Sequence, residues 1–229
     1  MKVLITQSNY IPWKGFIDSI ALVDKVVLYD NMQYTKRDWR NRNLIKTPQG
    51  LKWLSIPVEV KGKFDQKINE TKISDNKWNI NHLNILKQNY KKSKCYKEVI
   101  EWVETLYLSC NYEYLSDINF FFLKEILFFL DIKTSIMNSS LFDVVGDKTE
   151  KLVNICVDLN ATEYYTGPAA KNYLDENCFY DKNIKVNYLD YSGYKEYTQL
   201  YNDFEHCVSV LDLIFNCGAD SKKYLKNKL

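Results

Sequence analysis

The sequence of 229 residues is long enough to bury a substantial core, and its 46% hydrophobic and 26% charged residues are typical of a globular protein. A formal net charge of +2 argues against a molecule-wide field that attracts nucleic acid or an anionic membrane, so any anion binding must be local. The most apolar stretch, residues 120–132, contains Lys124, Glu125 and Asp131 and is too short to span a bilayer of about 30 Å.

Cysteine usage and the first residues predict the compartment. The six cysteines are scattered without a CxxC pair, as expected of small hydrophobic residues in a reducing environment. After Met1 only a few apolar residues precede the polar pair Thr6 and Gln7, too few for an export signal. We therefore expect a cytoplasmic protein without a membrane span.

The residue types available limit the metal chemistry. His82 and His206 are the two histidines of the chain, so a metal site built on several histidines is excluded and no metal ligand is assigned. Carboxylate-bound magnesium, with ATP, stays open as a cofactor, and no other cofactor is indicated.

The first thirty residues predict the topology of the core. Residues 3–6 have the pattern of a short buried strand, residues 16–23 that of a helix and residues 26–29 that of a second strand. This order is the βαβ unit of a parallel sheet, whose right-handed crossover places the first turn at the carboxyl edge. We therefore expect residues 7–15 to lie at that edge.

Further elements extend this unit to the rest of the chain. They are a strand within 51–60, helices over 76–90, 97–108 and 117–132, a helix capped by Asp147, strands over 162–166 and 185–190, and a helix over 208–216. The pattern predicts an α/β fold with a Rossmann-like parallel-sheet core, as one domain over residues 1–229 with a helical insertion at about 76–132.

The first candidate for chemistry is the turn over residues 7–16. Polar residues and the aromatic pair Tyr10 and Trp13 surround Pro12 and precede Gly15, which suits a rigid turn that brings backbone close to a ligand. Free N–H groups at a helix N-terminus bind anions. The alternative interpretation is a packed corner between a strand and a helix.

The second candidate is the basic segment 36–46, which has five basic residues in eleven. Guanidinium groups match phosphate oxygens in pairs, and Asn or Trp side chains can hydrogen-bond to or stack on sugars and bases. A solvated charged loop is the alternative. An RNA-binding segment would use the same residue types, but the near-neutral total charge argues against a stable nucleic-acid partner.

Two weaker signals lie further along the chain. Residues 163–174 predict a second strand-end loop for phosphate or substrate, although the single glycine lacks the spacing of a P-loop or a Rossmann fingerprint. His82, within a predicted helix, is either a general base or a histidine whose hydrogen bonds are satisfied in the fold.

Taken together, these residues resemble the WbqC-like protein family over nearly the whole chain. The similarity rests on dispersed positions in the first turn, the basic segment and the C-terminal part: Gln7, Tyr10, Pro12, Gly15, Phe16, Lys36, Trp39, Asn41, Arg42, Asn43, Lys46, Thr166, Gly167, Lys171, Tyr173, Gln199 and Asp212. The resemblance implies a role in O-antigen, lipopolysaccharide or other surface-polysaccharide biosynthesis. It also implies transfer of an acyl or aminoacyl group, such as glycyl, to the amine of a nucleotide-linked amino sugar.

A fainter similarity links the opening segment to pantothenate synthetase and to nucleotidylyltransferases with an HxGH-type turn. It implies a HUP-like sheet and an ATP-dependent ligase or nucleotidylyltransferase as the alternative enzyme. Tyr10 and Trp13 stand near the first histidine position and Phe16 at the second, so the imidazoles that stabilise a departing pyrophosphate are missing. A sugar-nucleotide-binding accessory protein without catalysis is a further alternative.

The transferase reading assigns roles to individual residues. The predicted catalytic residues are Asp30, His82 and Tyr10, with Asp30 or His82 accepting the amine proton. In this hypothesis the Arg/Lys segment holds the diphosphate, and Asn41, Asn43 or backbone N–H groups supply the oxyanion donor. The predicted substrate-binding residues are Gln7, Trp13, Gly15, Lys36, Arg40, Asn41, Arg42, Asn43, Lys46, Thr166, Gly167, Lys171 and Tyr173. The acyl donor and the oligomeric state are not determined by the sequence.

Overall fold

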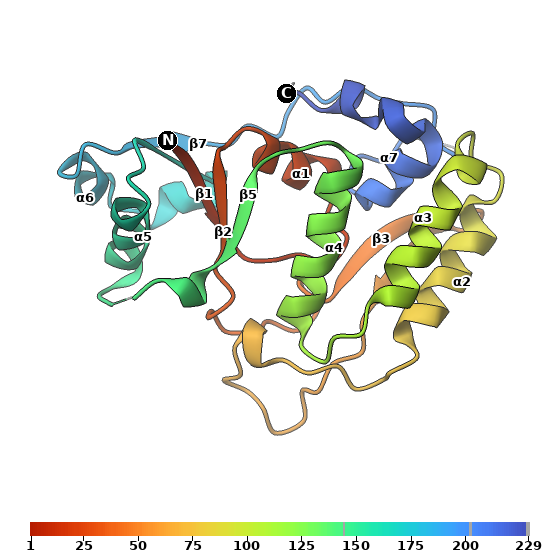
Figure 1. Ribbon diagram of the computed structural model, residues 1–229, viewed down its shortest axis with the longest axis horizontal. Helices are drawn as coiled ribbons and strands as arrows, with labels where there is room; N and C mark the ends of the chain where they lie inside the picture. Colours follow the sequence, from red (N-terminus) through yellow and green to blue (C-terminus); the bar gives the residue numbers. More distant parts are fainter. Residues whose placement is uncertain (144, 202, 228–229) are drawn as a thin grey trace.

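The computed structural model describes residues 1–143, 145–201 and 203–227, and its core is a five-stranded parallel sheet in the order β5-β2-β1-β6-β7 (Figure 1). The strands are β1 (Lys2–Thr6), β2 (Lys25–Leu28), β5 (Ser135–Asn138), β6 (Glu163–Thr166) and β7 (Lys185–Tyr188). The predicted Rossmann-like α/β fold is confirmed.

Helices cover both faces of the sheet, because each buried strand sends alternate side chains to opposite sides. Val3 and Ile5 pack with α5 (Lys148–Asp158) and α6 (Glu176–Tyr180), whereas Leu4 packs on the side of α1 (Lys14–Ala21) and α4 (Leu115–Phe129). Figure 1 shows these two groups of helices on either side of the sheet. Asp147 caps α5 and Glu150 completes the predicted capping box.

A helical insertion and a hairpin extend the domain on the α4 side. The insertion comprises α2 (Trp78–Tyr90), α3 (Tyr96–Ser109) and α4, and the last helix, α7 (Val210–Cys217), packs against α3 and α1. The hairpin pairs β3 (Arg42–Thr47) with β4 (Gly50–Ser55). The remaining short elements are η1 (Ile68–Glu70), η2 (Ser139–Leu141), η3 (Pro168–Asn172) and η4 (Gly218–Tyr224).

The hairpin bears on the alternative interpretation of residues 36–46 as a solvated charged loop, because the second half of this segment is a strand. Asn43 and Ile45 alternate with Arg42 and Leu44, so one side of β3 is buried although the segment is rich in polar residues. The predicted strand within 51–60 is β4, and it ends at Ser55, before Pro57. The basic segment is therefore half loop and half ordered hairpin.

The order of the strands creates a switch point between β1 and β6. From β1 the chain builds outward through β2 to β5, then crosses over to β6 and continues to β7 on the other side. Ligands of open α/β sheets bind outside the carboxyl ends of the strands at such a point. Residues that follow β1, β2 and β6 are therefore placed for binding.

The turn from β1 into α1 is packed rather than open. The Trp13 indole lies over Gly15, where an added Cβ atom would come within 2.4 Å of the indole ring. Val210 donates its backbone N–H to the Pro12 carbonyl at 2.8 Å, which joins this turn to the start of α7. The beginning of α1 is thus covered by the protein itself, as in the packed-corner interpretation.

Replacing Gly15 by Ala should destabilise the protein by about 1–3 kcal/mol, because the new methyl group must displace the Trp13 indole. Chemical denaturation measures this change in the free energy of unfolding. Gly167→Ala is the matched control with little expected effect, since nothing lies within 4 Å of its added Cβ. Equal effects of the two substitutions would refute the role assigned to Gly15.

Candidate functional site

Three neighbouring strands deliver polar residues to the carboxyl edge of the sheet. Ser8 follows β1, Asp30 follows β2, Asn138 ends β5 and Ser139 follows it. A cavity of about 150 Å³ opens there, lined by Leu28, Asp30, Asn69, Tyr114, Ser116, Asp117, Asn138, Ser139 and Ser140. We call this group of residues, with Ser8, Arg40 and Asn119, the edge site.

Ser8 connects the parts of the edge site. Its backbone N–H donates to Asp30 Oδ1 at 2.8 Å, and its hydroxyl accepts from Asn119 Nδ2 at 2.9 Å. Its carbonyl accepts from Arg40 Nη1 at 3.0 Å, and the Arg40 carbonyl in turn accepts from Asn119. These bonds join the ends of β1 and β2, the basic segment and α4 at one residue.

The Asp30 carboxylate is buried but incompletely bonded. It is 4% exposed, and its Oδ2 atom has no hydrogen-bond partner. Burial raises the pKa of the Asp30 carboxyl above its ordinary value, the hydrogen bonds from Ser8 and the charge of Arg40 oppose this, and Asp117 adds to it. Burial also raises the pKa of Asp117. A carboxylate with a raised pKa and a free oxygen at a cavity is suited to accept a proton.

Arg40 supplies positive charge next to this carboxylate. Its side chain is 14% exposed, and its buried Nε atom makes no hydrogen bond but forms an ion pair with Asp38 Oδ2 at 3.6 Å. Burial lowers the pKa of the Arg40 guanidinium, while the nearby Asp38 and Asp30 raise it. A buried guanidinium with an N–H group that makes no hydrogen bond is a donor for a developing or permanent negative charge.

The other predicted residues of the basic segment fall into two groups. The Asn41 amide donates to the Ile56 carbonyl at 2.8 Å, and the Asn43 amide donates to the Tyr10 and Ile11 carbonyls at 3.1 and 3.0 Å. Both amide donors are thus bonded to backbone. Lys36 is exposed, and Arg42 lies half-buried over an indole ring.

Asn43 holds a strained turn beside the edge site. Ile11 has a φ angle of 35°, a conformation that β-branched residues rarely adopt. The two hydrogen bonds from Asn43 fix the carbonyls at and before this residue. The strained turn that follows Ser8 and Asn9 is therefore anchored to the hairpin.

His82 and Tyr10 lie together in the core, where both are buried. The Tyr10 hydroxyl lies 2.9 Å from His82 Nδ1 and 2.6 Å from the Tyr107 hydroxyl, and His82 Nε2 lies 3.2 Å from the Ser55 carbonyl. Because the carbonyl only accepts, Nε2 carries the proton and Nδ1 accepts from Tyr10. Burial lowers the pKa of His82 to about 4. This arrangement corresponds to the satisfied-histidine interpretation.

The neutral state of His82 predicts a pH-dependent stability. Below the ordinary pKa of 6.5, His82 becomes protonated in the unfolded chain but stays neutral in the folded protein. The free energy of unfolding therefore falls as the pH drops from about 6.5 to about 4. The expected loss is about 3 kcal/mol, measurable by urea denaturation across this range. His82→Gln should flatten this part of the profile.

Asn84→Gln, an exposed substitution on the same helix, serves as the control and should keep the wild-type slope. The same slope in wild type and His82→Gln would contradict a neutral, buried His82.

Lys46 belongs to a separate polar network. Its ammonium donates to Gln199 Oε1 at 3.1 Å and to the Asp203 carbonyl at 2.6 Å. Gln199 contacts the Tyr197 hydroxyl, which donates to the buried Asp212. Lys46 also lines a cavity of about 450 Å³, between the hairpin and residues 201–205 as far as these are described.

The predicted residues after β6 lie on the far side of the switch point. Thr166 is buried at the end of β6, Gly167 is the N-cap of η3, and Tyr173 is exposed. The Lys171 ammonium lies 4.9 Å from the Tyr188 ring. Since β6 pairs with β1, these residues share the carboxyl edge with Gln7, which is partly exposed there. The sheet thus brings the first-turn and β6 segments to one edge.

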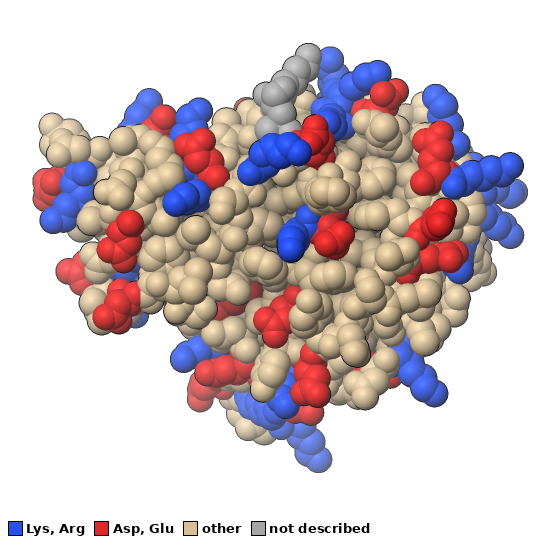
Figure 2. Space-filling view, viewed as in Figure 1, with Lys and Arg blue, Asp and Glu red and all other residues tan. Residues whose placement is uncertain are grey.

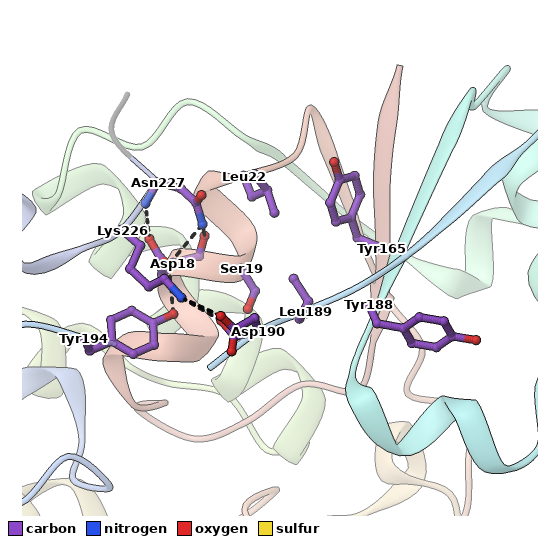
Figure 3. Close-up of a pocket in the computed structure, with 10 residues that line it drawn as sticks. All are labelled: Asp18, Ser19, Leu22, Tyr165, Tyr188, Leu189, Asp190, Tyr194, Lys226 and Asn227. Carbon is purple, nitrogen blue, oxygen red and sulfur yellow. Dashed lines mark hydrogen bonds and ion pairs between the residues drawn. The ribbon is translucent and has the colours of Figure 1, made fainter. Parts of the chain in front are cut away.

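Figure 3 shows a further cavity, of about 180 Å³, beside α1 and the ends of β6 and β7. Asp18 accepts hydrogen bonds there from the Tyr194 hydroxyl and from the Asn227 backbone and amide. Trp13 packs nearby against Tyr194. Because both Asp18 oxygens are bonded within the protein, this cavity is a weaker candidate than the edge site.

Sequence reasoning missed several residues of the edge site. Ser8 stood within the predicted turn without a role, and Asn119 lies in the most apolar helix, where it is fully buried. An amide in such a helix needs a hydrogen-bond partner, which is the signal that could have identified it. Asp117 and Ser139 carry no comparable signal, because only the folded chain brings them to Asp30.

Two properties of the described residues bear on metals and membranes. Residues 1–143, 145–201 and 203–227 contain no group of three or more His, Cys, Asp or Glu side chains arranged to hold a metal ion. In the same part of the chain, each helix is too short or too polar to cross a membrane.

The fold and the edge site define an α/β protein of Rossmann-like type with a polar cavity at the carboxyl edge of its sheet. Residues 7–224 match the WbqC-like protein family, and the chain belongs to this family. It is 48% identical over 225 residues to "Uncharacterized protein Rv1507c" of Mycobacterium tuberculosis (strain ATCC 25618 / H37Rv), covering 98% of this chain and 97% of that protein. No solved structure matches the chain.

Proposed function

We propose that the protein transfers an acyl or aminoacyl group, with glycyl as one candidate, to the amine of a nucleotide-linked amino sugar used for surface polysaccharide. The observation that carries this proposal is the Asp30 carboxylate, which is buried at a cavity with one oxygen unpaired. An amine attacks an acyl carbon only after it loses a proton. A desolvated carboxylate at the sheet edge is a suitable acceptor for that proton.

The proposed reaction also needs a proton for the leaving group and a hydrogen-bond donor for the carbonyl oxygen. The amine nitrogen forms a bond to the acyl carbon, the bond from that carbon to the leaving group of an activated donor breaks, and Asp30 passes the amine proton to the leaving group. The Arg40 guanidinium, whose Nε atom makes no hydrogen bond but lies 3.6 Å from Asp38 Oδ2, would stabilise the carbonyl oxygen as it becomes negative. We assign this donor role to Arg40, since the amides of Asn41 and Asn43 are bonded to backbone carbonyls.

Asp30 rather than His82 is the proposed base. His82 is held between Tyr10 and the Ser55 carbonyl in the core, and its pKa is lowered to about 4. Its buried position keeps it away from a bound amine, and its low pKa makes it a weak proton acceptor. Tyr10 is fully buried and bonded to both His82 and Tyr107, so we propose that it supports the first turn.

Incubating the purified protein with nucleotide-linked amino sugars and activated acyl or aminoacyl donors should yield an amide-linked product, detected by mass spectrometry. Asp30→Asn should reduce its rate of formation by about 10²–10⁴-fold, because the base is lost. The free energy of unfolding should not fall at pH 7, because burial disfavours the charged carboxylate.

A nucleotide-linked sugar with a hydroxyl group in place of the amine is the substrate control and should not be acylated. Product formation that is unchanged in Asp30→Asn would refute the proposed mechanism. Binding without product across the donor panel would favour the accessory-protein alternative, and release of AMP and pyrophosphate would favour the ATP-dependent alternative.

A further inference from the structure

Two exposed indole rings form a pair on the outward side of the basic segment and the hairpin. Trp39 and Trp53 are each 40% exposed, and their ring centroids lie 5.3 Å apart at an interplanar angle of 47°. Large aromatic side chains are usually buried, and a pair that remains exposed in this way marks a binding surface. We call Trp39, Trp53 and Arg42 the indole platform.

Arg42 fixes the orientation of this pair. Its guanidinium carbon lies 4.0 Å from the centre of the Trp53 ring, and its Nη2 atom donates to the Arg37 carbonyl. Its Nε atom is buried and has no hydrogen-bond partner. The platform therefore combines a flat aromatic surface with a guanidinium that can donate hydrogen bonds to an anion.

The register of the hairpin explains why these residues share a side. Arg42 and Leu44 alternate with the buried Asn43, and Leu44 pairs with Trp53 across the strands. At the other end of the same side, Lys46 and Leu51 line the cavity of about 450 Å³. The exposed Leu51 and Trp53 thus lie on the same side of the hairpin as Arg42.

The indole platform is adjacent to the edge site. The Trp39 carbonyl accepts from the Tyr10 backbone N–H at 3.1 Å, and the next residue, Arg40, bonds to Ser8. Consecutive Cα atoms are 3.8 Å apart, so Trp39 and Arg40 hold the two sites side by side. A ligand on the indoles is therefore close to the backbone that carries Arg40 of the edge site.

Charge around the platform selects an anionic ligand. Residues 36–42 contain four basic residues against one acidic residue, Asp38. Lys36 and Arg37 are exposed, and the Lys36 ammonium lies 5.9 Å from the Phe64 ring. Figure 2 shows basic and acidic side chains interspersed over the visible face, without a continuous positive field. A compact anion with an aromatic ring suits this surface better than a nucleic acid.

We propose that the indole platform binds the nucleoside diphosphate part of the activated sugar. The base stacks on Trp39 and Trp53, and the diphosphate contacts Arg42 and Arg37. This places the amino sugar toward Asp30, so the inference rests on the proposed function for the identity of the sugar.

Isothermal titration of the protein with UDP tests the platform without an acyl donor. Trp53→Ala should weaken UDP binding by about 5- to 100-fold, because it removes the surface on which the base stacks. Trp53→Phe should retain most of the affinity, and Arg42→Ala should weaken the binding of both UDP and pyrophosphate. Trp102→Phe, on α3 against Phe129, is the matched control and should bind UDP as the wild type does.

Pyrophosphate distinguishes stacking from simple anion binding, since its affinity should not change in Trp53→Ala. The inference is overturned if UDP binds no more tightly than pyrophosphate, or if Trp53→Ala binds UDP as the wild type does. Tighter binding of oligo(U) than of UDP, with a steep salt dependence, would also overturn it in favour of RNA. UDP binding that depends on Trp53 in a protein that forms no acyl product would support the platform and refute the transfer reaction.

Discussion

The hydrogen bonds made by Ser8 are the constraint on which the edge site depends. Its N–H, carbonyl and hydroxyl bond respectively to Asp30, Arg40 and Asn119, which come from three other parts of the chain. Because one residue bonds to all three, the Asp30 carboxylate and the Arg40 guanidinium are held close enough for their charges to interact. Preorganised charges of this kind favour a reaction more strongly than mobile ones.

The same arrangement is unfavourable for stability. Asp30 Oδ2 and Arg40 Nε are buried without hydrogen bonds, and Ile11 adopts a left-handed backbone conformation. Such features cost free energy and persist only where the surrounding structure enforces them. Asn43 provides part of that enforcement by bonding the Tyr10 and Ile11 carbonyls to the hairpin. Their concentration around one turn is what distinguishes this edge from the rest of the surface.

Residues that are neighbours in one sequence motif have different roles in the fold: some support the segment, and others lie at the edge site. In the first turn, Tyr10 enters the core while Ser8 faces the edge site. In the basic segment, the Asn41 and Asn43 amides donate to backbone carbonyls, whereas the Arg40 Nε–H makes no hydrogen bond and lies in an ion pair with Asp38. A spacing pattern identifies the segment that approaches a ligand. It does not separate the side chains that meet the ligand from those that hold the segment in place.

The sequence by itself determined the parallel sheet, the carboxyl-edge position of the first turn and the helical insertion, because hydrophobic periodicity and the handedness of βαβ units are local rules. It also determined Asp30 as a candidate base. Only the tertiary structure decided which groups surround it, since Asp117, Asn119 and Ser139 lie about a hundred residues away in the chain. The protonation state of His82 was likewise decided by burial and by partners from β4 and the first turn, which no local pattern encodes.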